Sequence, residues 1–249
     1  MRHLNFRLHY WPILTTVWVI ITYITSYALA VTKKDVSAMF PYISDTGAKP
    51  VESCIFGQML NMGAMFMFIC MFIRHKYIEM IFKNEKNYSP KILLINKWSF
   101  LFGLLGCFGM TIVANFQETA NLTTHFFGAS LTFLIGSVHF ILQTFISWKT
   151  NISTFTKYMR LFISSIVLPL FITTLTSANL SMRKFHGKDK LTWGKNDGGY
   201  ELHLVSTFTE WIMAISLNLY VLTYTNEFKN VKYDGVGFSA RTRKRSINI

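Results

Sequence analysis

The chain alternates long hydrophobic stretches with shorter polar ones. Six stretches of 17 to 22 residues contain no Lys, Arg or Asp; they are 12–31, 55–73, 98–114, 125–146, 161–178 and 204–224. A helix rises about 1.5 Å per residue, so about 20 residues cross a hydrocarbon layer about 30 Å thick. The stretches do not alternate between polar and apolar positions, as the strands of a membrane barrel do. We therefore predict an all-α membrane protein with a six-transmembrane-helix bundle.

This pattern divides the chain into a six-helix membrane domain, residues 1–228, and a basic tail, residues 229–249. The first stretch is longer than the apolar region of about 7–15 residues in a signal peptide, so we expect it to be kept as a membrane anchor. The tail ends in a basic cluster that either attracts anionic lipid or is simply solvated; it contains Arg241, Arg243, Lys244 and Arg245.

Composition supports this class. Hydrophobic residues make up 51% and charged residues 15%, which excludes a disordered chain, and three cysteines are too few for a disulfide scaffold. The net charge of +13 would also suit a nucleic-acid binder. Its distribution favours a membrane orientation instead, so we expect membrane lipids and membrane or cytosolic proteins as partners, and no nucleic acid.

The loop charges predict which way the bundle faces. The two termini and the loops 74–97 and 147–160 hold 17 Lys and Arg, whereas the loops 32–54, 115–124 and 179–203 hold 8. Basic residues are enriched in cytosolic loops of membrane proteins. The rule therefore predicts that the N-terminus and C-terminus are both cytosolic.

A few polar residues lie within the predicted spans, where each needs a partner. Counted by depth along its helix, Glu210 falls at the level of Gln58 and Asn61 in the outer half of the membrane, with His125 at the edge. We predict an intramembrane polar cluster of these four residues. One interpretation is helix packing through hydrogen bonds; the other is a titrating or ligand-binding site built on Glu210.

Catalytic signatures are absent from the sequence. It contains no zinc-binding helix motif, no nucleophile elbow and no glycine-rich phosphate loop. We therefore expect neither an enzyme nor a metal site, and no cofactor.

Two polar motifs border the predicted spans. The first outer loop contains Pro41, Ser44, Asp45, Thr46, Gly47 and Glu52, and the third helix ends in Asn115, Phe116, Gln117 and Glu118. Asp followed two residues later by Gly is typical of a turn in which Asp accepts a backbone N–H and Gly takes a positive φ. The alternative is an interaction surface.

These two motifs, together with the pair Glu210–Trp211, resemble the damage-regulated autophagy modulator (DRAM) family within the wider Frag/Sfk superfamily. The resemblance covers roughly residues 11–228 and departs at Val51, where the family has a proline or a small residue. It implies a six-helix protein of lysosomal or endosomal membranes that promotes autophagy without a catalytic activity.

Two short sites remain as candidates. Asn179 begins an N-x-S/T glycosylation sequence at the start of an outer loop. Tyr233 and Val236 form a Tyr-x-x-apolar arrangement of the kind that sorting adaptors read. We expect an endolysosomal, non-catalytic modulator of autophagy. The rival hypotheses are a transporter or channel that uses Glu210, and a plasma-membrane organiser of lipids or lipid kinases.

Overall fold

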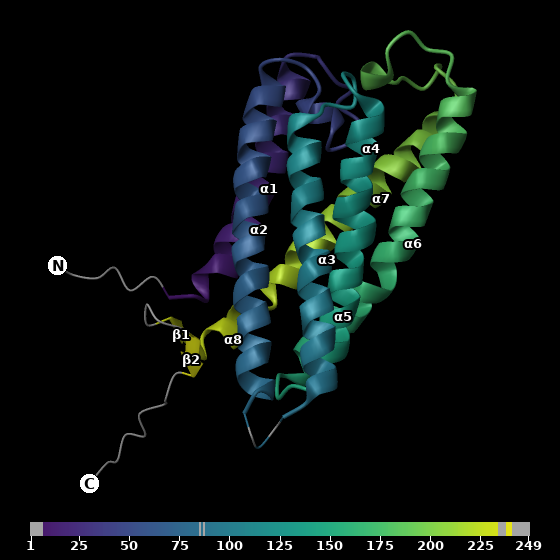
Figure 1. Ribbon diagram of the computed structural model, residues 1–249. Helices are drawn as coiled ribbons and strands as arrows, with labels where there is room; N and C mark the ends of the chain where they lie inside the picture. Colours follow the sequence, from purple (N-terminus) through teal and green to yellow (C-terminus); the bar gives the residue numbers. More distant parts are fainter. Residues whose placement is uncertain (1–6, 85, 87, 234–237, 241–249) are drawn as a thin grey trace, which may run out of the picture.

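The computed structural model describes residues 7–84, 86, 88–233 and 238–240, and most of them are helical (Figure 1). The long helices are α1 (Tyr10–Thr32), α2 (Glu52–Phe82), α3 (Pro90–Asn115), α6 (Thr154–Lys184) and α7 (Tyr200–Leu222). Between α3 and α6 run α4 (Leu122–Ser130), the π-helical turn η3 (Leu131–Ile135) and α5 (Gly136–Trp148). The short elements are η1 (Asp45–Gly47), η4 (Lys190–Thr192), α8 (Thr225–Phe228), β1 (Val231–Tyr233) and β2 (Phe238–Ala240).

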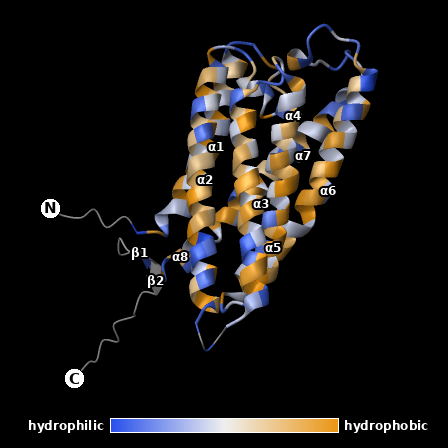
Figure 2. Cartoon of the chain, in the orientation of Figure 1, coloured by the Kyte–Doolittle hydropathy of each residue, from blue (hydrophilic) through white to orange (hydrophobic). Residues whose placement is uncertain are grey.

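Six helices of the described chain are long and apolar enough to cross a membrane, which confirms the predicted number. The fourth is the continuous run α4–η3–α5, Leu122–Trp148, and the sixth joins α7 to α8. Figure 2 shows hydrophobic residues along most of each helix and hydrophilic residues gathered at the two ends of the bundle. This distribution suits a bundle surrounded by lipid.

The helices extend beyond the apolar stretches that predicted them. Helix α2 continues nine residues past residue 73, and α6 begins seven residues before residue 161. Local signals set the true ends. Pro90 occupies the first turn of α3, where its missing N–H costs nothing. Ser153 caps α6 by accepting the backbone N–H of Thr156 at 3.2 Å.

The helices form a closed ring in which each spanning helix packs against its neighbours in sequence, and α7 closes the ring against α1. Glycines allow the closest approach, between α3 and the fourth span. A Cβ at Gly109 would lie 2.5 Å from Cβ of Leu131, and one at Gly106 would lie 3.1 Å from Cα of Gly136. Small residues at a helix interface are a common means of tight packing in membranes.

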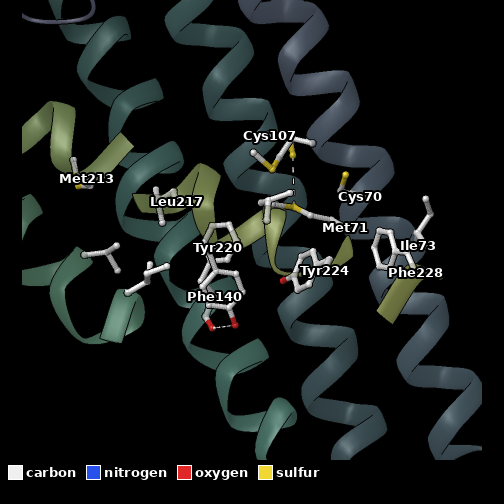
Figure 3. Packing of buried hydrophobic residues seen from close by; sticks show 14 of the residues in the cluster. Cys70, Met71, Ile73, Cys107, Phe140, Met213, Leu217, Tyr220, Tyr224 and Phe228 are labelled. Carbon is white, nitrogen blue, oxygen red and sulfur yellow. Dashed lines mark hydrogen bonds between the residues drawn. The ribbon is translucent and has the colours of Figure 1, made fainter. Parts of the chain in front are cut away.

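The largest hydrophobic core lies inside this ring. Figure 3 shows Tyr220 of α7 beside Phe140 of α5, and Met71 of α2 facing Cys107 of α3; Tyr224, which precedes α8, lies next to Tyr220. The hydroxyl of Tyr220 donates to the carbonyl of Phe140 at 3.1 Å, so the phenol enters the core with its polar atom satisfied.

A fully buried group of three charges lies near the end of the bundle that carries the chain termini. The carboxylate of Glu227, in α8, accepts a short charged hydrogen bond from Arg74 of α2 and another from Arg160 of α6. None of the three side chains is more than 4% exposed. We call this group the ion triad.

Neutral groups complete the coordination of the two guanidinium groups. Nε of Arg74 donates to Gln143 at 2.8 Å, and Arg160 donates to Thr223 at 2.8 Å and to Ser147 at 2.6 Å. Both guanidiniums also lie about 5 Å from the ring centre of Tyr224, at 5.1 Å and 4.9 Å. Glu227 balances only one of the two positive charges. The other is therefore stabilised by the side-chain oxygens that accept these hydrogen bonds and by the ring of Tyr224.

All three charges of the ion triad lie outside the apolar stretches that predicted the spans. Each lies in a helix that runs on past its stretch. These charges are buried because Glu227 pairs with both arginines and neutral groups bind the remaining donors.

The described end of the chain forms a small antiparallel hairpin of β1 and β2, in which Val231 pairs with Ala240. Of the candidate sorting residues, Tyr233 ends β1 and Val236 lies outside the described residues. The basic cluster at 241–245 also lies outside them.

Replacing Glu227 with Gln is expected to lower the free energy of unfolding by about 3–5 kcal/mol, because it leaves two buried guanidiniums without a counter-charge. Thermal and denaturant unfolding of the purified protein in detergent measures this. The control is Glu79→Gln, which removes a partly exposed carboxylate that pairs with Lys76 and Lys83 and is expected to cost less than about 1 kcal/mol. Equal effects of the two variants would contradict a stabilising role for the ion triad.

Candidate functional site

Three loops gather at one end of the bundle, 33–51, 116–121 and 185–199, drawn at the top of Figure 1. We call this the loop end, and the opposite one the terminal end. A cavity of about 440 Å³ lies here between the loops, α4, α6 and α7. A second, of about 90 Å³, lies deeper within the bundle. We call the larger the loop-end cavity; the two share part of their lining, including Ser44, His125, Phe133 and Glu210.

The loop before α2 is fastened to α7 by a run of specific contacts. The backbone N–H of Ile43 donates to the carboxyl of Glu210 at 2.9 Å, and the indole N–H of Trp211 donates to the carbonyl of Pro41 at 2.9 Å. Phe40 stacks on Phe208 with ring centres 3.9 Å apart. Glu210 thus has a structural partner, a backbone donor from another loop.

The Ser44–Gly47 motif forms the helical turn η1, and the expected positive φ at Gly47 is wrong. Gly47 is required for space: a Cβ there would lie 2.5 Å from two ring atoms of Phe56. The hydroxyl of Thr46 donates to the carbonyl of Ile43 at 2.6 Å and lies 2.9 Å from that of Ser26. The motif is a buried turn that seats the loop against α1 and α2.

Asp45, in the same turn, faces another acid. Its carboxyl is buried, and the carboxyls of Glu118 and Glu210 line the same cavity. Burial, followed by the nearby charge of Glu118, raises the pKa of Asp45 well above its usual range. Asp45 therefore holds its proton to a higher pH than a solvent-exposed aspartate does.

The motif Asn115–Glu118 ends α3 and leads into the loop before α4. The carbonyl of Phe116 accepts the ring N–H of His125 at 2.7 Å, and the backbone of Gln117 accepts two N–H groups of the following turn. Ser44 donates to Glu118 at 3.3 Å, which ties this loop to the first one. The two motifs therefore meet in space, as members of one loop assembly.

The predicted polar cluster is only half correct. His125 and Glu210 line the same cavities, but Gln58 is exposed on another face of α2 and lines neither of them. Asn61 pairs with Asn115 through two amide hydrogen bonds of 3.1 Å. The residues share a depth in the membrane but differ in rotation about their helices, and this separates them.

Two other predicted residues occupy structural positions. Glu52 begins α2 with its side chain buried, and pairs with Lys33 at the end of α1 at 3.2 Å. Asn179 lies within α6, five residues before the last residue of that helix, Lys184, and Ser181 of its glycosylation sequence is buried. The expectation of a loop site at Asn179 is therefore wrong.

Several residues of the cavity escaped sequence reasoning because they lie in loops or at a helix start. Tyr42 contacts Ser206 through its hydroxyl, and burial raises the pKa of Tyr42. His203 stacks on Trp193 with ring centres 4.2 Å apart. Lys188 and Lys190 line the mouth. Among the described residues, no group of three or more His, Cys, Asp and Glu is arranged to hold a metal ion.

Replacing Glu210 with Ala is expected to cost about 1–3 kcal/mol of unfolding free energy, because the N–H of Ile43 loses its acceptor in a buried place. Glu210→Gln keeps a carbonyl oxygen in reach of that N–H and is expected to remain close to the parent protein. Thermal unfolding of both variants in detergent tests this. If Gln and Ala cost the same, the hydrogen bond to Ile43 is not what Glu210 contributes.

The raised pKa of Asp45 predicts a pH-dependent stability. A carboxyl that holds its proton more tightly in the folded state favours folding in acid, and that contribution is lost as the pH rises from the ordinary value of 3.8 through the raised folded pKa. Asp45→Asn is expected to flatten this decline and to be at least as stable as the parent at pH 7. Unfolding temperatures at pH 4.5 and 7.5 measure it, with Asp35→Asn as the control, since Asp35 pairs with Lys49 away from the cavity. A decline of unchanged steepness in Asp45→Asn would contradict the assignment.

Comparison with known proteins agrees with this architecture. Residues 7–231 match the model of the family described as Frag1/DRAM/Sfk1/Cwh43P N-terminal domain. The chain is 34% identical over 230 residues to DNA damage-regulated autophagy modulator protein 2 of Bos taurus, covering 90% of this chain and 85% of the relative. It is 37% identical over 224 residues to modulator protein 1 of Homo sapiens, covering 88% and 90%.

A third relative is modulator of macroautophagy TMEM150B-B of Xenopus laevis, which is 32% identical over 240 residues, 95% of this chain and 91% of the relative. No solved structure matches the chain. The family model and these relatives span nearly the whole chain, including the loop assembly and all six membrane helices. The chain therefore belongs to the Frag1/DRAM/Sfk1 family.

Proposed function

We propose that this protein resides in the lysosomal or endosomal membrane and modulates autophagy, without catalysis, by binding other membrane components. The observation that carries the proposal is the set of relatives named as autophagy modulators, at 33–37% identity and matched over about nine-tenths of the chain. The match includes the elements that build the loop end, so the relatives share the part of the molecule that is richest in specific polar contacts.

In this proposal the loop end faces the lumen and both termini face the cytosol. The uneven distribution of basic residues supports this orientation. The ion triad removes Arg74 and Arg160 from the loop charges, and the terminal end still holds 15 Lys and Arg against 8 at the loop end. The asymmetry therefore does not depend on the two buried arginines.

A transporter or channel is the second candidate, and one observation favours it: a cavity that holds Glu210 beside two other carboxyls within the bundle. Alternating access needs that cavity to open to both sides of the membrane, whereas the ion triad joins helices tightly at the terminal end. Solute flux into proteoliposomes that is lost in Glu210→Gln would favour transport over the leading proposal.

Expression of a tagged full-length chain in cells depleted of their own family members tests the leading proposal. The protein is expected to overlap with a lysosomal membrane marker and to restore the starvation-induced, lysosome-dependent breakdown of long-lived proteins. Glu79→Gln serves as a matched control, because it changes a partly exposed carboxylate at the terminal end and is expected to behave like the parent. A signal confined to the plasma membrane would favour the lipid-organiser hypothesis, and a lysosomal signal without restored breakdown would contradict the role in autophagy.

A further inference from the structure

The loop-end cavity holds an excess of unpaired acid. The carboxyls of Asp45, Glu118 and Glu210 all line it. Within the described part of the chain none of them forms an ion pair with Lys, Arg or His. Glu118 accepts a hydrogen bond from the hydroxyl of Ser44 and Glu210 accepts one from the N–H of Ile43, and both donors are neutral. Such a site attracts a cation, because buried charge is costly until it is paired.

A second, independent feature of the cavity also lacks a partner. His203 lines the cavity, is only 4% exposed, and has an Nδ1 atom without a hydrogen-bond partner among the described residues. Its ring is fixed by stacking on Trp193 and by an edge contact with Tyr42, whose ring centre is 5.3 Å away. A neutral imidazole has one acceptor nitrogen, which a donor on a ligand is able to use.

Most of the remaining lining is apolar and belongs to α4, η3 and α6. Phe126 and Phe133 line one side, and Phe171 and Leu175 line the other. The residues of α6 that line the cavity, from Phe171 to Met182, all follow Pro169, and a proline inside a helix removes a backbone hydrogen bond and bends it. In Figure 1, α6 diverges from α4 towards the loop end.

We propose that the loop-end cavity binds a single-chain amphiphile with a protonated amine head group. The ammonium group lies among the carboxyls of Asp45 and Glu118 and the imidazole of His203, and the hydrocarbon chain descends between α4 and α6. An ammonium has three donors and no acceptor, which matches a site built from acceptors. The volume of about 440 Å³ lies within the range of about 300–1,000 Å³ typical of small-ligand sites.

The alternative of an anionic head group fits less well. The two cations of the lining, Lys188 and Lys190, are exposed at the mouth, so an anion bound there would lie against solvated side chains. An anion bound deeper would meet three carboxyls. The carboxyls in the interior of the cavity therefore favour a cation over an anion.

Binding of tritiated hexadecylamine to the purified full-length protein in detergent micelles tests the proposal, with scintillation proximity as the readout at pH 7. Binding is expected to be saturable, displaced by unlabelled hexadecylamine, and displaced poorly by hexadecanol or palmitate. The double variant Asp45→Asn with Glu118→Gln is expected to weaken it by about tenfold or more, since it removes the charges that the ammonium needs. Glu79→Gln, at the terminal end, is expected to bind like the parent.

A second variant tests the same site through its shape. Ala178→Phe adds bulk to the α6 wall without touching the carboxyls, and is expected to abolish binding while an unfolding temperature in the same detergent shows that the fold is kept. Equal binding by parent and double variant, or equal displacement by hexadecanol, would overturn the proposal. Stronger binding of palmitate that is lost in Lys190→Gln would also overturn it, in favour of an anion site. The assay uses purified protein, so its outcome is independent of the lysosomal location and of the role in autophagy.

Discussion

The rest of the structure depends on the buried ion triad. One carboxylate on the last helix, Glu227, pairs with an arginine from α2 and with another from α6, and the remaining donors of both guanidiniums reach α5 and the end of α7. Four of the six membrane spans are therefore joined at one point, in a place where unpaired charge is very costly. This fixes the terminal end of the bundle. The spans are free to diverge only at the other end, and that is where the larger cavity lies.

The loop end is held by a different kind of contact. Its loops are joined by hydrogen bonds between side chains of one segment and the backbone of another, such as Glu210 with Ile43, Trp211 with Pro41 and His125 with Phe116. Such bonds satisfy backbone groups that lie too deep for water. The result is a folded cap on the bundle, whose acidic inner surface forms part of the cavity.

The number of spans follows from the sequence because stretch length and the thickness of a bilayer determine it. The positions of the charged residues do not follow, since a hydropathy rule treats Arg74 and Arg160 as the ends of spans, while only the folded bundle brings Glu227 between them. In the structure, the predicted polar cluster does not include Gln58 and Asn61, for a related reason. Depth along a helix was readable for Gln58 and Asn61, but rotation about the helix depends on which face packs, and here Phe56, Leu60 and Ala64 turn inwards. His203 and Tyr42 belong to no periodic pattern of polar residues along a helix. They become part of the cavity only where the loops meet in space.

The fastening of the first loop to α7 has a consequence for how the chain is made. The loop at 40–47 is synthesised long before Glu210 and Trp211. The N–H of Ile43 and the carbonyl of Pro41 therefore lack these hydrogen-bond partners until the last span has entered the membrane. The same holds for Arg74 and Arg160, whose counter-charge comes at Glu227, within the last part of the chain. The first helices therefore lack these contacts until the sixth span has been synthesised. The sixth span supplies the missing partners at both ends of the bundle. A chain that ends before this span therefore leaves the backbone groups of the first loop and both arginines unpaired.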